Sequence, residues 1–248
     1  MIIDLSGPQK LLTGRLDGEL AHYSTAHVRK VVEQELVRTG AVNVAFDFSG
    51  VTMQPYLDVF SHLPTIRTQR LILRAARMSD AQDLYEYSSD PEVARHVLWT
   101  AHTSIHQTRT YIRYLLRQYK SGAPSSYVIA LRETGKVIGT IGYMWIRPED
   151  RSGEVGYSLH RGYWNQGIMT EALEAVLALG FLKLNLNRIE AQHETATPAS
   201  GKVMQHVHMQ HEGPLRQRVY NKGRFVDVEL YAILRKDYRA PAHLQGSL

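Results

Sequence analysis

Arg161-Gly-Tyr-Trp-Asn-Gln-Gly-Ile-Met-Thr-Glu-Ala-Leu-Glu-Ala-Val-Leu-Ala-Leu-Gly-Phe181 is the stretch that decides the fold of this 248-residue chain. It begins as a glycine-punctuated turn and continues as a helix, with Glu171 and Glu174 near the helix start, where the helix dipole favours carboxylates. Apolar residues recur at the three- and four-residue spacing of one buried helical face: Met169, Ala172, Leu173, Val176, Leu177, Gly180 and Phe181. Because residues 152–160 just upstream read as a strand, the unit is strand, loop, helix.

The loop of this unit is a candidate anion site. A glycine at the start of a helix lets phosphate groups approach free backbone N–H groups. The loop lacks the Lys-Ser/Thr pair of a P-loop and the Gly-x-Gly-x-x-Gly pattern of a dinucleotide-binding loop. Spacing alone therefore leaves two interpretations open, a phosphate site or a core helix that follows a tight turn.

Composition bounds the class of protein. A hydrophobic content of 44% with 9% aromatics is typical of a soluble globular protein with a substantial core. The absence of cysteine excludes disulfides, thiolate metal sites and a cysteine nucleophile, and it fits a reducing cytoplasm. The first thirty residues show no signal-peptide pattern, and no apolar run approaches the ~20 residues of a membrane span. We therefore expect a cytoplasmic protein with no membrane partner.

Charge favours an acidic ligand. The formal net charge is +5 and the pI about 9.3, which suits a ligand with several phosphates or work close to ribosomal RNA. Lysine and arginine are nevertheless dispersed, without a nucleic-acid-binding motif, so we expect no direct nucleic-acid partner. The histidines lack the spacing of a zinc-binding helix, and we expect no metal site.

Residues 65–240 predict an α+β domain. Capping boxes at Ser79 and Ser104 start two helices, and a further helix follows Thr197 and Pro198. Consecutive strands with short turns imply antiparallel pairing, whereas the central helix links two strands as a crossover. The expected fold is a mostly antiparallel sheet flanked by helices. Its strands are expected within residues 66–74, 126–131, 137–144, 154–159, 187–193 and 225–234.

Residues 1–54 have a different pattern, a strand near 11–18, a helix over 25–40 and a strand over 42–48. About fifty residues bury too little apolar surface to be comfortably stable alone. This segment is therefore expected to pack on the following domain, to pair its sheet edge with another chain, as in a homodimer, or to stay loosely ordered. Residues 55–64 are the expected linker, and residues 241–248 a tail.

The central motif resembles a known family. Trp164-Asn-Gln-Gly-Ile-Met-Thr-Glu-Ala172, preceded by Glu154-Val-Gly-Tyr157, is similar to the acyl-CoA-binding motif of GNAT N-acetyltransferases, and more narrowly to the Rim-type branch that acetylates ribosomal-protein N-termini. The resemblance implies acetyl-CoA as co-substrate, with loop amides gripping its pyrophosphate. Trp164 and Met169 depart from the wider pattern, which weakens the match without excluding binding, because backbone amides make the contact. The implied coenzyme-binding residues are Tyr157, Trp164, Asn165, Gln166, Gly167, Ile168, Met169, Thr170 and Thr197.

Two residues are candidates for the chemistry. Glu154 begins the strand that leads into the loop and is the candidate base, the alternative being a solvated strand-end carboxylate. Thr197-Pro-Ala-Ser200 resembles the family's Asn-x-x-Ser, which implies Ser200 as the partner of the coenzyme sulfur; the alternative is an ordinary helix-start serine. His208 stands where the family usually ends a helix with glycine, so the local turn is expected to differ or to be strained.

The N-terminal segment resembles a second family. Leu12-Thr-Gly-Arg-Leu-Asp17, His22-Tyr-Ser-Thr-Ala26 and Val44-Ala-Phe-Asp-Phe-Ser-Gly-Val-Thr52 are similar to the first half of a STAS domain of the anti-sigma-factor-antagonist type. The phosphorylatable Asp-Ser-Ser-Gly turn of that family is replaced by Met53-Gln-Pro-Tyr56. Sigma-factor regulation is therefore not implied.

The leading expectation is an enzyme that moves an acetyl group from acetyl-CoA to a primary amine, with a protein N-terminus as the acceptor. Two alternatives stay open. One is the same chemistry on a small-molecule or antibiotic amine. The other is a regulatory protein with a vestigial coenzyme site and a STAS-like docking segment, which the departures at Met169, Thr197 and His208 favour and the missing phosphoserine turn opposes.

Overall fold

The structure is a computed structural model that describes residues 2–6, 11–20, 43–53, 55–241 and 244. The chain divides into two compact units, Met1–Asp58 and Val59–Leu248. The division falls inside the expected 55–64 linker, part of which is the helix α2 (Pro55–Ser61). Among the described helices, none is both long and apolar enough to cross a bilayer.

The first unit contains a three-stranded sheet in the order β1-β2-β3, with β1 (Ile2–Ser6), β2 (Leu11–Leu20) and β3 (Asn43–Met53). β1, which the sequence pattern did not predict, pairs antiparallel with β2, and β2 pairs parallel with β3. A parallel pair needs a crossover connection, as the strand-helix-strand pattern implies. The helix expected over 25–40 lies outside the described residues.

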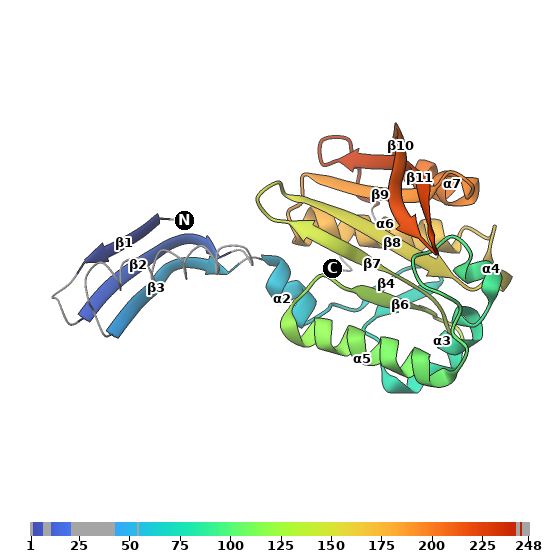
Figure 1. The fold of residues 1–248 in the computed structure, drawn as a ribbon, viewed down its shortest axis with the longest axis horizontal. Helices are drawn as coiled ribbons and strands as arrows, with labels where there is room; N and C mark the ends of the chain where they lie inside the picture. The colour runs from blue at the N-terminus through green and yellow to red at the C-terminus, as the bar shows by residue number, and fades with distance from the viewer. Residues whose placement is uncertain (1, 7–10, 21–42, 54, 242–243, 245–248) are drawn as a thin grey trace. The chain divides into compact units, whose positions relative to one another are not determined.

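The second unit is built on an eight-stranded sheet in the order β10-β11-β9-β8-β7-β6-β5-β4 (Figure 1). Every neighbouring pair is antiparallel except β8 and β9, which run parallel because helix α6 connects them. The predicted mostly antiparallel α+β sheet with one crossover is confirmed. The strands are β4 (Ile66–Arg67), β5 (Leu71–Arg74), β6 (Ser126–Leu131), β7 (Val137–Arg147), β8 (Ser152–Leu159), β9 (Arg188–Glu194), β10 (Gln210–Asn221) and β11 (Arg224–Leu234).

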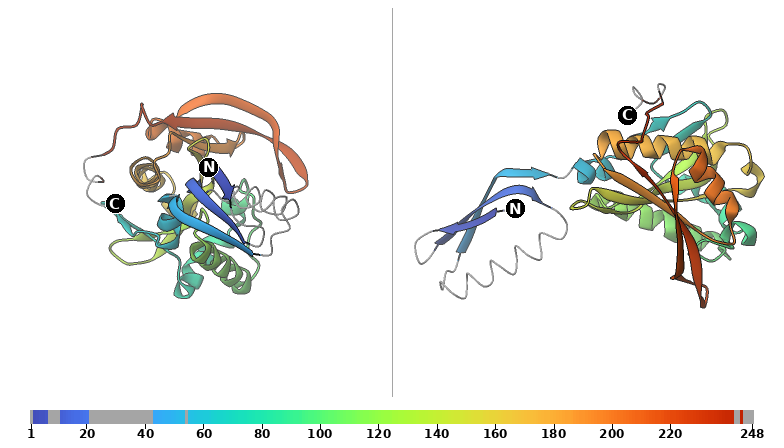
Figure 2. Two further views of the ribbon diagram at one scale, coloured as in Figure 1. Left: turned by 90° about the vertical axis from the view of Figure 1, so that its left-hand side faces the viewer. Right: turned by 90° about the horizontal axis from the view of Figure 1, so that it is seen from above.

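Helices cover both faces of this sheet, and α5 and α6 lie on opposite sides of it (Figures 1 and 2). Side chains alternate along a strand, so Val128 and Ala130 of β6 pack in one cluster with Ile112 and Leu115 of α5. On the other face, the hydroxyl of Tyr143 in β7 donates to a backbone carbonyl of α6. The helices are α3 (Ala81–Ser88), α4 (Pro91–Ala94), α5 (Ile105–Ser121), α6 (Ile168–Ala178) and α7 (Pro198–His206).

The expected cap at Ser79 is wrong. Residues Met78–Asp80 form a 3-10 turn, and α3 begins at Ala81. The carboxylate of Asp80 accepts the amide N–H of Arg77 at 2.7 Å and pairs with both terminal nitrogens of Arg74 at 2.8 Å. The Asp80 carboxylate thus closes the 3-10 turn that precedes α3, and no side chain caps α3 itself.

The sheet opens between β8 and β9. Their pairing covers only three residues, Ser152↔Arg188, Gly153↔Ile189 and Glu154↔Glu190. Beyond Glu154 the two strands no longer pair, so residues 155–159 of β8 and 191–194 of β9 border a gap in the hydrogen-bonded sheet.

Candidate functional site

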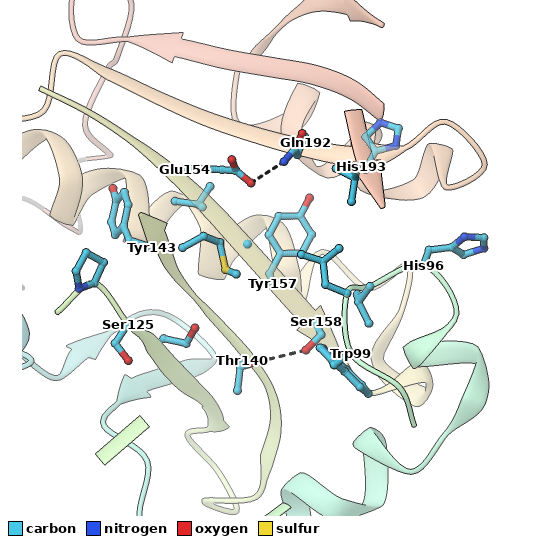
Figure 3. Close-up of a pocket in the computed structure, with 18 of the residues that line it drawn as sticks. His96, Trp99, Ser125, Thr140, Tyr143, Glu154, Tyr157, Ser158, Gln192 and His193 are labelled. Carbon is cyan, nitrogen blue, oxygen red and sulfur yellow. Dashed lines mark hydrogen bonds between the residues drawn. The ribbon is translucent and has the colours of Figure 1, made fainter. Parts of the chain in front are cut away.

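A cavity of about 280 Å³ lies where β8 and β9 separate (Figure 3). Its walls come from β7, β8 and β9, from the segment after α4, from α5 and from the β10–β11 hairpin. Among the lining side chains are Trp99, Tyr111, Thr140, Tyr143, Glu154, Tyr157, Ser158, Gln192 and Glu194. The site is therefore assembled from segments far apart in the sequence.

The cavity joins the two faces of the sheet, because side chains alternate along β8. Ser158 faces α3, since it hydrogen-bonds Thr140 at 3.2 Å and Thr140 contacts Tyr87 of α3. Tyr157 faces the opposite side and donates its hydroxyl proton to the carbonyl of Ser200 in α7 at 3.1 Å. A ligand held on the α6–α7 side and one held on the α3–α5 side would thus meet at the gap between β8 and β9.

Glu154 lies in the cavity wall, where Figure 3 shows its hydrogen bond to Gln192, and both of its oxygens are engaged. Oε2 accepts the indole N–H of Trp145 at 2.8 Å, and Oε1 accepts the side-chain amide of Gln192 at 3.1 Å. Both donors are neutral, so they fix the carboxylate without neutralising its charge. Each oxygen keeps a lone pair for a further proton or water. This geometry differs from that of a freely solvated strand-end glutamate.

The loop before α6 is braced by its own side chains. The indole N–H of Trp164 donates to the carbonyl of Leu159 at 2.8 Å, and Gln166 donates to the carbonyl of Gly162 at 2.8 Å. The side chains of Ile168 and Met169 are buried in the core. These residues therefore shape the loop and leave its backbone to contact a ligand.

The backbone of this loop presents a row of free donors. Asn165 and Gly167 have φ of 58° and 71°, in the left-handed region that asparagine and glycine tolerate. Within the part of the chain that the structure describes, the amides of residues 165–170 donate to no protein acceptor, and the first paired amide is that of Glu171, to Gly167 at 3.1 Å. Residues 164–167 are exposed. A row of free N–H groups at the positive end of a helix, exposed over residues 165–167, fits a pyrophosphate and favours the anion-site interpretation.

The start of α7 brings together three predicted site residues. The amide of Ser200 donates to the carbonyl of Thr197 at 3.2 Å, and Tyr157 reaches the carbonyl of Ser200. The hydroxyl of Thr197 is buried and has no partner among the described residues. Burial raises the pKa of Tyr157 well above its usual value, so this phenol remains a proton donor near neutral pH. Of these three residues, Tyr157 lines the cavity, whereas Thr197 and Ser200 lie behind it and are not among its lining residues.

Four further residues near the cavity were missed by sequence reasoning: His96, Glu194, Asn221 and Lys222. Glu194 Oε2 accepts from His96 Nδ1 at 2.9 Å, and Glu194 Oε1 accepts from Asn221 Nδ2 at 2.6 Å. The ammonium of Lys222 donates to three carbonyls, those of residues 94, 95 and 97, at the end of α4. Only the turn signal Asn221-Lys-Gly-Arg224 was visible in the sequence, because the partners lie up to 128 residues away.

Known proteins are similar to this chain in sequence. Residues 70–210, more than half of the chain, match the acetyltransferase (GNAT) domain. The chain is 37% identical over 176 residues to an uncharacterised N-acetyltransferase of Bacillus licheniformis, covering 71% of this chain and 99% of that protein. It is 30% identical over 97 residues to the ribosomal-protein-serine acetyltransferase of Escherichia coli strain K12, covering 39% and 54% of the two proteins.

A solved structure shares the fold. RimL, a ribosomal α-N-protein acetyltransferase in complex with coenzyme A, superposes with a TM-score of 0.62 over 68% of this chain and 97% of its own, at 24% identity. The family match begins at residue 70 and does not cover residues 1–54, whose likeness to a STAS segment stays a prediction. The split sheet, the row of free amides and the matching domain lead to one conclusion: the chain belongs to the GNAT family of N-acetyltransferases, which use acetyl-CoA.

Proposed function

We propose that the acceptor of this N-acetyltransferase is the α-amine of a protein N-terminus. The proposal rests on the position of Glu154. Two neutral hydrogen-bond donors fix its carboxylate at the gap between β8 and β9. An α-ammonium with a pKa near 7.8 costs only about 1 kcal/mol to neutralise at pH 7, whereas a lysine near 10.4 costs about 4–5 kcal/mol. A carboxylate is a modest base, so it is better matched to the α-amine.

The proposed reaction uses both sides of the cavity. On the α6–α7 side, the amides of residues 165–170 hold the pyrophosphate of acetyl-CoA. Glu154 takes a proton from the acceptor ammonium, directly or through one water. The neutral nitrogen then attacks the thioester carbonyl, a C–N bond forms, and the C–S bond breaks. The coenzyme leaves as a thiol after taking a proton, and the hydroxyl of Ser200 stabilises the sulfur by a hydrogen bond as its charge develops.

Two relatives support this acceptor class. The Escherichia coli relative is a ribosomal-protein-serine acetyltransferase, and the structural neighbour RimL is a ribosomal α-N-protein acetyltransferase. The alternative of a vestigial coenzyme site is opposed by the free, exposed amides of the loop and by membership of the family. Acetylation of a small amine in the same cavity is the competing outcome of the test.

The test is an acceptor panel with the full chain and acetyl-CoA, followed by release of free thiol. The panel contains a lysine-bearing peptide with a free N-terminus, the same peptide with a blocked N-terminus, and a set of small amines. We expect turnover of the free peptide alone, with the acetyl group found on its first residue by fragment mass spectrometry. Turnover of the blocked peptide, or of small amines only, would contradict the proposal.

A further inference from the structure

The cavity is acidic although the protein is basic. The formal net charge of the chain is +5. Among the described residues that line the cavity, however, the carboxylates are Glu154 and Glu194, and none is lysine or arginine. Glu154 is sufficient as the base of the proposed reaction. Glu194 has no part in that step, so its presence in the wall calls for another role.

Glu194 is held as a buried anion. Its residue, the last of β9, is 7% exposed, and each oxygen accepts one short hydrogen bond, from His96 and from Asn221. Burial alone would disfavour the charge, but these hydrogen bonds outweigh it, and the pKa of Glu194 lies below its ordinary value. A carboxylate has about four lone-pair sites, so Glu194 retains acceptor capacity toward the cavity.

Glu194 lies beyond Glu154 on the same side of the split sheet. Glu154 is in register with Glu190, so Glu190, Gln192 and Glu194 share its face. Gln192 already contacts Glu154 through its side chain, and Glu194 follows about 7 Å further along β9. A peptide whose α-amine lies at Glu154 could therefore bring the side chain of its second residue to Glu194.

The lysine and arginine side chains near Glu194 leave its carboxylate available to a cation of the acceptor. The guanidinium of Arg224 lies 3.9 Å from Glu194 Oε2, with 70% of its side chain exposed, and a pair so long and so exposed contributes little. The ammonium of Lys222 is occupied by the carbonyls of residues 94, 95 and 97. Among the described residues, the groups that an incoming cation would meet at Glu194 Oε2 are the distant guanidinium of Arg224 and the imidazole of His96.

We propose that Glu194 is an acceptor-specificity residue that binds a lysine or arginine side chain at the second position of the acceptor polypeptide. The inference rests on the proposed N-terminal acetylation and names the substrate class of that same site. Glu194 acts on binding and not on proton transfer. We therefore expect it to lower the KM for the acceptor and to leave kcat unchanged.

The test uses the full chain and three peptides that differ only at the second residue, which is lysine, norleucine or glutamate. Norleucine keeps the length of lysine without its charge. We expect kcat/KM for the lysine peptide to exceed that for the norleucine peptide about tenfold, through KM, with the glutamate peptide lowest. Glu194→Gln should remove this preference while retaining turnover of the norleucine peptide, which reports that the variant is folded. Glu149→Gln, an exposed carboxylate in the β7–β8 turn, should retain the preference.

Arg224→Ala tests the effect of the nearby guanidinium. Because this pair is long and exposed, its removal should retain the preference for lysine or raise it by no more than about twofold, and a preference lost in this variant would overturn the inference. Equal use of the three peptides by the wild type, or a lysine preference that survives in Glu194→Gln, would overturn the inference and leave N-terminal acetylation standing. Failure of all three peptides beside turnover of small amines would instead overturn the proposed function.

Discussion

At the scale of single residues, the chemistry of the cavity depends on how Glu154 is held. The sequence identified this carboxylate as a candidate, but its state is set by Trp145 on β7 and Gln192 on β9. Those partners lie nine and 38 residues away, so no local pattern could pair them with Glu154. The same is true of Glu194, whose partner His96 is 98 residues distant.

Glu154→Gln should lower kcat by about 100-fold, the lower end of what general base catalysis contributes. The substituted amide has almost the same shape but cannot take a proton, and its N–H₂ group would face one of the two donors that hold the carboxylate. The KM for acetyl-CoA should stay unchanged, because the loop amides lie elsewhere. Steady-state kinetics beside Glu149→Gln, the exposed control, check this. An unaltered kcat would exclude Glu154 as the base.

His208 is a residue whose strain the sequence did anticipate. Helix α7 ends at His206, and His208 has φ of 64° in the position where helices usually carry glycine. The amide of His208 donates to the carbonyl of Gln205 and that of Met209 to Met204, both at 3.0 Å, as in a Schellman motif. A side chain in this left-handed conformation costs roughly 1–2 kcal/mol.

His208→Gly should therefore stabilise the protein by about 1 kcal/mol, which raises Tm by about 2–4 °C for a chain of this size. His206→Gly is the matched control, because it puts glycine inside the same helix, where it should destabilise by about 1 kcal/mol. Thermal denaturation of the two variants measures both effects. A lower Tm for His208→Gly would show that the imidazole makes a contribution larger than its backbone strain.

At the scale of elements, one carboxylate joins the coenzyme loop to the edge of the sheet. The sequence assigned Glu171 to the helix dipole alone. In the structure its Oε1 accepts the hydroxyl of Thr68 at 2.5 Å and the amide of Arg70 at 2.7 Å, and its Oε2 accepts Arg70 Nε at 2.7 Å. Arg70 in turn donates to the carbonyl of Gln166 at 2.9 Å. The β4–β5 hairpin, α6 and the loop thus hold one another in place.

Glu171→Gln should destabilise the protein by about 1–3 kcal/mol at pH 7, because one oxygen that accepts from Arg70 becomes a donor. Burial raises the pKa of Glu171, but the hydrogen bonds from Thr68 and Arg70 outweigh it, so this pKa lies below its ordinary 4.5. The stabilisation by the charge is then fully present above pH 4.5 and is lost as the pH falls through the lowered pKa.

The difference in Tm between the wild type and Glu171→Gln should accordingly be constant near neutral pH and shrink in acid. Melting curves between pH 7 and pH 3 measure it, with Glu174→Gln on the same helix as the control. The variant should also bind acetyl-CoA more weakly, since Arg70 braces the loop. A difference that grows in acid would contradict the lowered pKa of Glu171.

At the scale of the whole molecule, the sequence predicted most of the acetyltransferase unit and little of the cavity wall. Periodicity and turn signals predicted the central helix, its flanking strands and the antiparallel order, because each depends on residues close in sequence. The range of strand β10 was not predicted beyond a strand start near His211 and a hairpin-like turn after Tyr220, since its burial pattern is mostly exposed and offers no apolar alternation. The extent of the β8–β9 gap could not be predicted either, because it depends on where two parallel strands stop pairing.

The division of the chain into two units makes a prediction about its N-terminal part. The family match begins at residue 70, and the relative from Bacillus licheniformis is matched over 99% of its own length by 71% of this chain, so we expect the acetyltransferase fold to be complete without residues 1–54. Phe60 at the end of α2 is fully buried and contacts Tyr143 edge to face at 6.2 Å, so it belongs to the second unit. The N-terminal limit of a stable fragment should therefore lie before Phe60.

A fragment of residues 55–248 should unfold cooperatively with a Tm within about 2 °C of that of the full chain. Acetyl-CoA at 100 times its Kd should stabilise it by ~2.7 kcal/mol, as it does the full chain. A fragment that starts at Thr65 loses Phe60 and should be destabilised by about 3–5 kcal/mol, as when a buried phenylalanine is truncated. Thermal melts with and without coenzyme compare the two fragments. If the longer fragment melts far below the full chain, residues 1–54 stabilise the acetyltransferase unit by packing on it, the first of the three roles that the sequence left open.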